Sequence, residues 1–327
     1  MQAWRVRSLG RPDDVLSLED VPEPSPGPGE VVIQTEAAAL NFPDILVCRG
    51  EYQERPPLPF TPGMEAAGRV VSAGAGVTIA EGTRVAGICR LPHGGFAEQA
   101  VLGAGELFEI PDEIPTATAA AMVVTYQTGI VGLHRRAGLR AGETLLVHAG
   151  AGGIGSAAIQ IGLAAGARVV ATAGGAEKVG VCRALGADLA IDYQKDDFVA
   201  AVRDFTGGCG ADVVYDPVGG ETFDLSRRAV AFEGRIVVVG FTGGRITQAP
   251  TNHALVKNYS VVGLHLALYW TRQPLYIADV YQTLLRLYAE GSIDPLISER
   301  IDLTAIPKAL NSMALRGTIG KIVVTKE

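Results

Sequence analysis

The residues of this chain that are best spaced for chemistry are the small ones at positions 149 to 155. Ala149, Gly152 and Gly155 follow the spacing A-x-x-G-x-x-G, a dinucleotide-binding fingerprint with alanine in place of its first glycine. Gly152 leaves room for a pyrophosphate to approach the backbone, and Gly155 allows a helix to pack closely on the preceding strand. The N–H groups and positive dipole end of that helix then face the phosphates. The pattern predicts a nucleotide site, and the alternative is a structural strand-to-helix turn.

The choice between the two nicotinamide dinucleotides depends on the end of the next strand. A site for NAD usually carries an acidic residue there, about 20 residues after the glycines. Here the sequence reads ATAGG over 171–175, with no acid to repel a 2′-phosphate. Lys178 follows in the first turn of the next expected helix, and its ammonium together with the helix terminus predicts a phosphate site for NADPH. The alternative is a solvated lysine paired with Glu177 or Asp188.

The elements that position these residues form a regular alternation of strands and helices after Pro115. A long helix is expected over 116–136, before the first strand of the alternation. The expected strands are 144–148, 168–173, 189–191, 212–216, 235–240 and 260–264, and the helices between them are 153–165, 176–185, 196–206 and 220–231. Six strands joined by helices predict a doubly wound Rossmann domain with a six-stranded parallel sheet.

The first part of the chain has the shorter spacing of a β-rich, barrel-like domain. Two strands are expected within 2–21, others at 31–40, 65–73, 83–89 and 95–101, and a short helix at 43–49. Helices near 274–290 and 304–315 and a last strand over 319–325 are expected to return to this domain. The expected domains are therefore 1–120, completed by 268–327, and 121–267.

Composition and charge narrow the class of protein. The 327 residues carry a formal net charge of −7 without a basic stripe, which argues against nucleic acid as a partner. The four cysteines stand far apart, so they form neither a zinc knuckle nor a redox pair, and they suit a reducing cytosol. No apolar signal segment is visible, and polar residues interrupt the apolar run 117–133, which is typical of a buried helix. We expect a cytoplasmic protein with no membrane partner.

Five segments together resemble a known family. They are NFPDILVCRGEYQERPPLPFTPGMEAAG (41–68), GGFAEQ (94–99), HAGAGGIG (148–155), GADVVYDPVGG (210–220) and GRIVVVGF (234–241). In this order they resemble the medium-chain dehydrogenase/reductase superfamily, and within it the zinc-free quinone oxidoreductases related to zeta-crystallin. The resemblance covers essentially the whole chain. It implies a GroES-like β domain built from both termini, a central NADPH-binding Rossmann domain, and a homodimer paired through the edge strand near 260–264.

The resemblance also implies which residues bind the cofactor. Asn41 matches an asparagine that faces the nicotinamide ribose and the substrate, and Thr128 matches a threonine at the start of the Rossmann domain. Thr128 could instead cap or pack within its helix. A family lysine and tyrosine beside the 2′-phosphate match Lys178 and Tyr193. The expected cofactor-binding residues are Asn41, Thr128, Ala149, Gly152, Gly153, Ile154, Gly155, Gly174, Lys178, Tyr193, Gly240 and Phe241.

The acceptor is expected beside Tyr52, which matches a tyrosine in the family's G-x-Y turn, and beside His265, Tyr269 and Trp270. Packing is the alternative for each of these side chains. Leu46 stands where several quinone reductases carry a second tyrosine, so their detailed quinone contacts do not carry over. The expected catalytic residues are Asn41, Tyr52 and Thr128.

A metal site is not expected. Metal-dependent relatives carry a cysteine where Asn41 stands and a histidine where Met64 stands, whereas a catalytic zinc needs three ligands with nitrogen, sulfur or carboxylate chemistry. The implied function is therefore metal-free, NADPH-dependent hydride transfer to a quinone or another electron-poor conjugated carbonyl. Such an acceptor needs mainly positioning and exclusion of water. Two alternatives remain: an enoyl-thioester or 2-alkenal reductase with Tyr52 as proton donor, and a nucleotide-binding protein without turnover.

Overall fold

A computed structural model describes residues 1–326 of the chain, which form two compact units. Unit 1 comprises residues 1–124 and the segment from residue 297 onward, and unit 2 comprises residues 125–296. Both units contain a six-stranded sheet, but the sheet of unit 2 is wholly parallel and that of unit 1 mostly antiparallel. The α/β class and the two kinds of sheet predicted from the sequence are confirmed.

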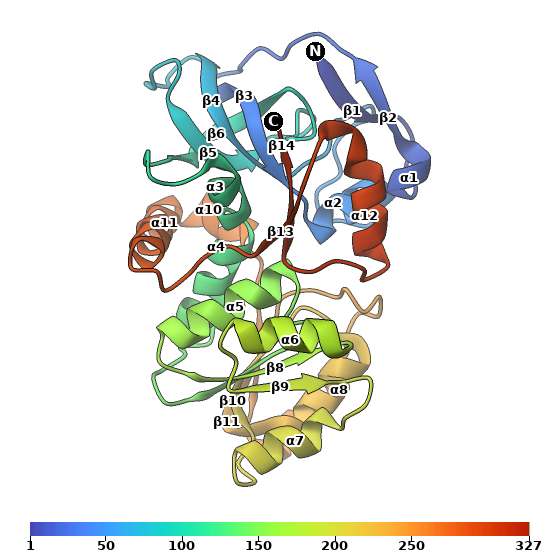
Figure 1. The fold of residues 1–327 in the computed structure, drawn as a ribbon, viewed down its shortest axis with the longest axis vertical. Helices are drawn as coiled ribbons and strands as arrows, with labels where there is room; N and C mark the ends of the chain where they lie inside the picture. The colour runs from blue at the N-terminus through green and yellow to red at the C-terminus, as the bar shows by residue number, and fades with distance from the viewer. Residues whose placement is uncertain (327) are drawn as a thin grey trace. The chain divides into compact units, whose positions relative to one another are not determined.

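The sheet of unit 2 is doubly wound. Its strand order is β12-β11-β10-β7-β8-β9, and α5 and α6 lie on one face while α7 and α8 lie on the other (Figure 1). The strands are β7 (Thr144–Val147), β8 (Arg168–Ala173), β9 (Leu189–Asp192), β10 (Ala211–Asp216), β11 (Val230–Val238) and β12 (Ser260–Gly263). The helices are α5 (Gly153–Ala164), α6 (Ala176–Ala184), α7 (Phe198–Phe205) and α8 (Gly220–Ala229).

Burial on both faces explains why these strands are continuous apolar runs. Leu146, Val170, Val214 and Ile236 come from four neighbouring strands and pack in one core cluster with Phe223 of α8. Because parallel strands end at the same edge, the residues that follow β7, β8, β9, β10 and β11 are brought together there.

Four further helices complete unit 2. They are α4 (Thr125–Ile130), α9 (Thr251–Lys257), α10 (Ala267–Arg272) and α11 (Pro274–Ala289). The sequence pattern assigns residues from 268 onward to the β domain, whereas the contacts of the chain divide at 296/297. The reason is packing, because α11 contacts both α4 and α10.

The long helix expected over 116–136 is interrupted. The stretch consists of α3 (Thr116–Met122), α4, and a π-helix (Val131–Arg136), with a break at Val123 and Val124. At the break the Val124 N–H donates to Glu65 Oε2 at 2.6 Å, so a side chain distant in sequence binds a backbone group at this point. The stretch 116–136 is long and apolar enough to cross a membrane by composition, but 83% of its most apolar window is buried inside the protein.

The sheet of unit 1 has the order β13-β14-β3-β4-β5-β6, and an additional pairing of β3 with β6 closes it into a barrel. Its strands are β3 (Glu30–Ala39), β4 (Glu65–Ala73), β5 (Arg84–Cys89), β6 (Gln99–Glu109), β13 (Ile297–Ile301) and β14 (Lys321–Thr325). A separate ladder joins β1 (Gln2–Val6) to β2 (Leu16–Asp20), and the helices are α1 (Pro12–Val15), α2 (Phe42–Arg49), α3 and α12 (Ile306–Ala314).

The predicted strand 95–101 is wrong at its start. β6 begins at Gln99 and continues to Glu109. Residues 94–96 instead donate their N–H groups to the carbonyls of Thr61, Gly63 and Pro62, in a turn against the loop before β4. The sequence pattern also missed β13, α9 and α10, whose residues are mostly exposed and show little apolar periodicity.

Candidate functional site

The glycine turn after β7 has the geometry that the fingerprint predicts. Ala149 adopts a left-handed backbone with φ 51°, which a glycine would adopt at lower cost. A Cβ on Gly155 would lie 2.1 Å from the Ala149 carbonyl oxygen, so only glycine allows α5 to approach the turn this closely. Around Gly152, by contrast, the nearest atom to an added Cβ is 3.4 Å away.

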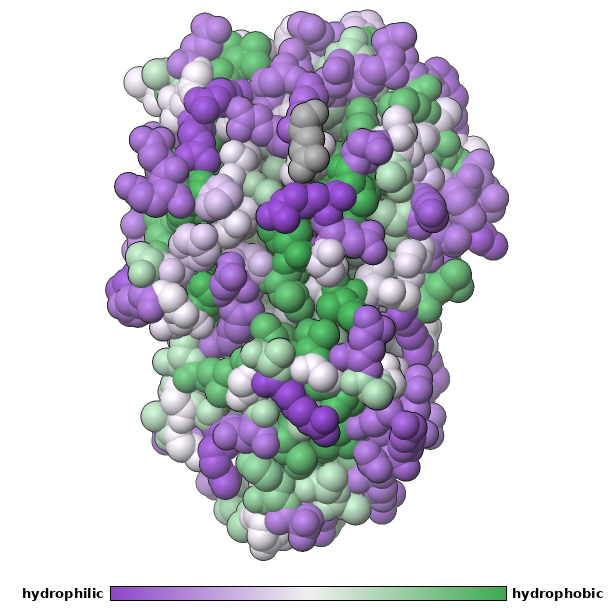
Figure 2. Space-filling model, in the orientation of Figure 1, coloured by the Kyte–Doolittle hydropathy of each residue, from purple (hydrophilic) through white to green (hydrophobic). Residues whose placement is uncertain are grey.

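The first turn of α5 is suited to an anion. The helix has no side-chain cap and no acidic residue in its first turn, and Gly152, Gly153 and Ile154 are partly exposed. None of the residues of α5 is charged, and Figure 2 shows hydrophobic residues gathered over this helix. Backbone N–H groups at the positive end of a helix dipole are therefore the groups available to bind a phosphate.

The end of β8 holds an acidic neighbour that sequence reasoning missed. Asp192, at the end of β9, accepts hydrogen bonds from the N–H groups of Gly175 (2.9 Å) and Gln194 (3.1 Å). The Gly175 bond is the main cause that lowers the pKa of Asp192. The spacing rule looks only at the second strand and misses an acid that reaches the same turn from the third.

The two residues predicted to bind the 2′-phosphate of NADPH lie beside the turn that follows β8. Tyr193 is 46% exposed, and its hydroxyl oxygen lies 2.7 Å from the position of a Cβ on Gly174. Lys178 is partly exposed in the first turn of α6. A phosphate bound here would meet the ammonium and the α6 terminus, and also the negative charge of Asp192.

The ends of β10 and β11 contribute Gly240 and Phe241. Asp216 Oδ1 accepts from the N–H groups of Val218 (2.8 Å) and Gly219 (2.9 Å), which shapes the turn into α8. Phe241 is 38% exposed, and one ring carbon lies 2.8 Å from the position of a Cβ on Gly219. The predicted nucleotide residues that follow β7, β8, β9 and β11 thus belong to one edge of the sheet.

His148, between β7 and the glycine turn, has a structural role. Its ring nitrogens bond to Thr172 Oγ1 (2.9 Å) and Ser226 Oγ (2.8 Å), and Ser226 in turn donates to the Thr222 carbonyl. Burial lowers the pKa of His148, so the ring is neutral. These hydrogen bonds connect the residue after β7 to β8 and to α8.

Of the remaining predicted residues of unit 2, two are buried and two are partly exposed. Trp270 is 8% exposed and donates its indole N–H to Gln127 Oε1 at 2.9 Å, so packing accounts for it. Thr128 is also buried in α4, whereas His265 and Tyr269 are partly exposed, with the Tyr269 ring 5.9 Å from that of Tyr276. Gln127 was not among the residues singled out from the sequence.

Tyr52 of unit 1 is half-buried beside Val6, Val47, Cys48 and Phe60. Its hydroxyl makes no hydrogen bond within residues 1–326. Burial is the main cause that raises the pKa of Tyr52, so the phenol stays protonated near neutral pH and remains a donor. A role for it in the reaction stays a prediction.

Asn41 lies in a buried polar cluster rather than among open donors. Its Oδ1 accepts from Lys321 Nζ (2.8 Å), and its Nδ2 donates to Glu65 Oε1 (2.7 Å) and to the Ala39 carbonyl (3.1 Å). Sequence reasoning missed Lys321 and Glu65. The available signal was a charged residue of each sign at the start of an apolar strand, since buried charges are nearly always paired.

The possible metal ligands of unit 1 are dispersed. Across the described part of the chain, no three histidine, cysteine or acidic side chains are close enough to hold one. Burial raises the pKa of Cys48 to about 12 and that of Cys89 well above its usual value. Zinc binds the thiolate form of cysteine.

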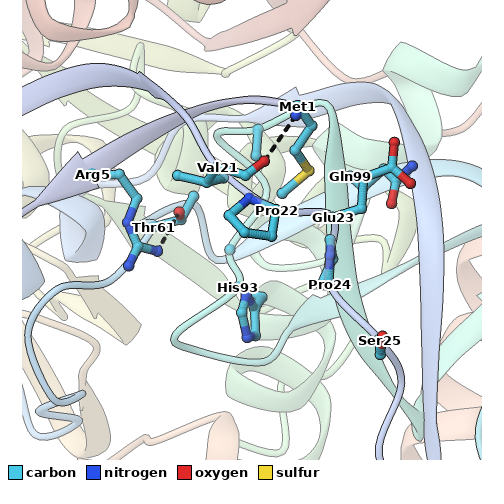
Figure 3. A pocket seen from close by; sticks show the side chains of 12 residues that line it. Met1, Arg5, Val21, Pro22, Glu23, Pro24, Ser25, Thr61, His93 and Gln99 are labelled. Atoms are coloured by element: carbon cyan, nitrogen blue, oxygen red, sulfur yellow. Dashed lines mark hydrogen bonds between the residues drawn. The ribbon is translucent and has the colours of Figure 1, made fainter.

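A pocket of about 340 Å³ in unit 1 lies away from all of the predicted site residues. Figure 3 shows its lining, in which Met1 donates to the Val21 carbonyl (2.9 Å) and Arg5 to Thr61 Oγ1 (3.2 Å). Prolines 22 and 24 form part of its wall, and its charged side chains, Arg5 and Glu23, differ in sign. It carries no arrangement that points to a reaction.

Each of the two units matches a model of a known protein family. Residues 27–112 match the family model for the alcohol dehydrogenase GroES-like domain, and residues 153–290 match that for zinc-binding dehydrogenases. The chain is 37% identical to quinone oxidoreductase-like protein 2 of Rattus norvegicus over 95% of its own length and 89% of that protein's. The Bos taurus protein of that name is 38% identical over the same shares.

Solved structures of similar proteins match over the whole chain. A mycobacterial structure complexed with NADPH is 31% identical, with a TM-score of 0.93 and 100% of both chains covered. The Escherichia coli quinone oxidoreductase complexed with NADPH is 27% identical, with a TM-score of 0.92 over 100% of both chains. The CurK enoyl reductase is 27% identical, with a TM-score of 0.87 over 99% of this chain and 98% of that one.

Proposed function

The chain belongs to the medium-chain dehydrogenase/reductase superfamily, among its quinone oxidoreductases, and we propose that it uses NADPH to reduce quinones or other electron-poor conjugated carbonyls. The observation that carries the proposal is the glycine turn at Gly152 and Gly155, which leaves the first N–H groups of α5 open to a pyrophosphate. The NADPH complexes of two similar proteins support the choice of cofactor. Lys178 and Tyr193 are the residues we assign to the 2′-phosphate.

The reaction moves a hydride from the nicotinamide to the acceptor and adds one proton, which yields NADP⁺ and the hydroquinone. NADPH supplies the hydride, and the protein's part is to orient the two rings and exclude water. We assign Asn41 and Thr128 to the nicotinamide side and Tyr52 to the acceptor. The neutral phenol of Tyr52 can hydrogen-bond an acceptor oxygen as negative charge develops on it.

We propose that no metal takes part, although one matching family model describes zinc-binding dehydrogenases. The support is the chemistry of the donors. Asn41 stands where metal-dependent relatives carry a cysteine, its amide oxygen is bound by the Lys321 ammonium, and burial raises the pKa of the nearby cysteines. Elemental analysis of the purified protein should show far less than one zinc per chain, and chelators should leave NADPH oxidation unchanged.

An enoyl-thioester or 2-alkenal reductase is the second candidate. The observation that favours it is the Tyr52 hydroxyl, a protonated group that makes no hydrogen bond within residues 1–326. It could protonate the enolate left by hydride addition to a β-carbon. An enoyl reductase is also among the similar solved structures.

Steady-state assays of NADPH oxidation with a benzoquinone, a 2-alkenal and an enoyl-CoA separate these functions. Turnover of the quinone above the other two supports the proposal, and turnover of none of them favours a nucleotide-binding protein without activity. Tyr52→Phe should reduce quinone turnover only slightly if Tyr52 positions the acceptor. A loss of about 10²-fold confined to the enoyl substrates would identify a general acid.

We also propose a homodimer formed through β12. This strand is the outermost of the unit 2 sheet, and unpaired strand edges tend to pair with another chain. Val261 on β12 is 39% exposed, and Phe232, Leu255 and Val256 nearby in the chain are at least 70% exposed. Light scattering should give twice the mass of the chain at micromolar concentration, and Val261→Lys should shift it to the monomer.

A further inference from the structure

The cluster around Asn41 consists of four polar side chains that are almost completely inaccessible to solvent. Asn41 is 5% exposed, Asp44 1%, Glu65 0% and Lys321 3%. They come from the start of α2, the start of β4 and the start of β14. Burying charges is costly unless each one is paired and hydrogen-bonded, so the cluster must be complete to be stable.

The Lys321 ammonium is fully coordinated by oxygen. Its Nζ donates to the Leu40 carbonyl (2.8 Å), to Asn41 Oδ1 (2.8 Å) and to Glu65 Oε1 (2.7 Å). An ammonium has three donors and no acceptor, so these three bonds use all of its hydrogen-bonding capacity. The side chain has no donor left for a ligand.

The ammonium binds the oxygen side of the Asn41 amide, and two acceptors bind its nitrogen side. Because lysine only donates, the amide oxygen must point to Lys321 and the NH₂ group to Glu65 and the Ala39 carbonyl. Both amide hydrogens are thus engaged. Without the ammonium, Oδ1 would lose its donor on that side, and the amide would be held less firmly.

Two other bonds connect this amide to the surrounding backbone. Asp44 accepts from the Asn41 N–H (2.8 Å) and from the Met64 N–H (3.0 Å), while Glu65 Oε2 holds the Val124 N–H. The start of α2, the start of β4 and the break after α3 are therefore fixed relative to one another through a few polar atoms.

We propose that Lys321 is a positioning residue whose ammonium holds the oxygen side of the Asn41 amide in place for the reaction, and that a free ammonium ion can replace it when the side chain is shortened. The inference rests on the proposed function, since Asn41 is assigned there to the nicotinamide side. A misplacement of about 1 Å of a group beside the reacting atoms can reduce the rate by about 10²-fold. Shortening Lys321 leaves three oxygens already arranged around a monovalent nitrogen cation.

The test is chemical rescue of Lys321→Ala. We expect the kcat for quinone reduction to fall by about 30- to 100-fold in this variant. Methylammonium chloride at about 50 mM should then raise the kcat of the variant at least tenfold. Tetramethylammonium chloride at the same ionic strength should restore nothing, because it has the charge but no N–H donors. Lys308→Ala, which removes an exposed lysine of α12, should behave as the wild type with either salt.

Thermal stability gives a readout that does not depend on turnover. Methylammonium should raise the melting temperature of Lys321→Ala in proportion to the logarithm of its concentration, and should not change that of the wild type. Full activity of Lys321→Ala, or equal rescue by both salts, would overturn the inference. A wild type that binds NADPH but reduces no quinone would count against the proposed function, while the stability arm would still test the cation site.

A second variant covers the case in which Lys321→Ala does not fold. The double variant Glu65→Gln with Lys321→Met removes the two members of the buried ion pair together, so neither charge is left without its partner. We expect it to fold and to lose at least tenfold in kcat without rescue by methylammonium, because methionine fills the space of the lysine side chain. Wild-type kcat in this folded variant would show that the ammonium has a purely structural role.

Discussion

The two regions that carry the predicted site residues are built in opposite ways. In unit 2, the edge of the sheet presents backbone N–H groups of α5 that no side chain caps, next to glycines. In unit 1, Asn41 is enclosed by side chains of both charges whose hydrogen bonds are made to one another. The open region is specified by residues at most six positions apart, from Ala149 to Gly155, whereas the closed region depends on partners as far apart as Glu65 and Lys321.

The largest effect should come from breaking the closed region. Glu65→Ala leaves the Lys321 ammonium buried without its counter-ion and removes the acceptor of the Val124 N–H. We expect the free energy of unfolding to fall by about 3–5 kcal/mol, measured by urea denaturation. Arg286→Ala, which removes an exposed i,i+4 pair with Glu290, is the control and should cost less than about 0.5 kcal/mol. Equal losses of unfolding free energy in the two variants would show that the buried cluster does not depend on its ion pair.

In the open region, even the methyl side chain of an alanine at Gly155 should lower both stability and NADPH affinity. Gly155→Ala places a Cβ 2.1 Å from the Ala149 carbonyl oxygen and forces α5 away from the turn. We expect a loss of about 3 kcal/mol in unfolding free energy and a fall of more than tenfold in NADPH affinity by fluorescence titration. Gly180→Ala in α6, where an added Cβ meets nothing within 4 Å, should leave the affinity unchanged and stabilise the helix.

The preference for NADPH over NADH tests which residues of the open region bind the 2′-phosphate. Lys178→Ala should weaken NADPH binding by about ten- to a hundredfold and leave NADH nearly unaffected, because a charge-assisted contact contributes about 1.5–3 kcal/mol. Asp192→Asn should change the preference in the opposite direction, since it removes a negative charge beside the Gly175 N–H. Equal weakening of both cofactors by Lys178→Ala would disprove the assignment of the 2′-phosphate.

The two regions should also respond to pH with opposite signs. Burial raises the pKa of Asp44 to about 7, so between about pH 4 and 7 the folded state holds a proton that the unfolded state has released. Its contribution to stability therefore falls as the pH rises through this window. Burial lowers the pKa of His148, so the unfolded state binds the extra proton below about pH 6.5 and stability is lost as the pH falls.

Hydrogen exchange separates these two contributions by region. Between pH 5 and 8, the opening free energy of α2 should fall and that of β7 should rise, by at most about 1.4 kcal/mol per pH unit for each group. Changes of the same sign in both segments would show that the two groups do not titrate as their surroundings suggest.

Prediction from the sequence succeeded where the structure is local. The parallel strands of unit 2 were found because burial on both faces makes them apolar runs, and Gly152 and Gly155 were found because the turn requires them at that spacing. The family and the GroES-like and Rossmann folds were likewise recognisable from short segments.

Prediction from the sequence failed where a residue distant in the chain determines the local structure. At the break after α3 the Val124 N–H is bound by Glu65, and no pattern within 116–136 predicts this interruption. The Asn41 amide is bound by Lys321, 280 positions away, and no pattern around Asn41 reveals this partner. Asp192 reaches the end of β8 from the neighbouring strand, which spacing along the chain does not reveal.

The position of Lys321 in the chain has a consequence for synthesis on the ribosome. Residues 125–296 are complete before Lys321 is translated, so unit 2 has its whole sequence available while Glu65 and Asn41 still lack their cation. Domains tend to fold as units while the chain emerges. The sheet of unit 1, though begun first, is therefore completed only when β14 inserts between β13 and β3, and unit 2 is free to fold ahead of that step.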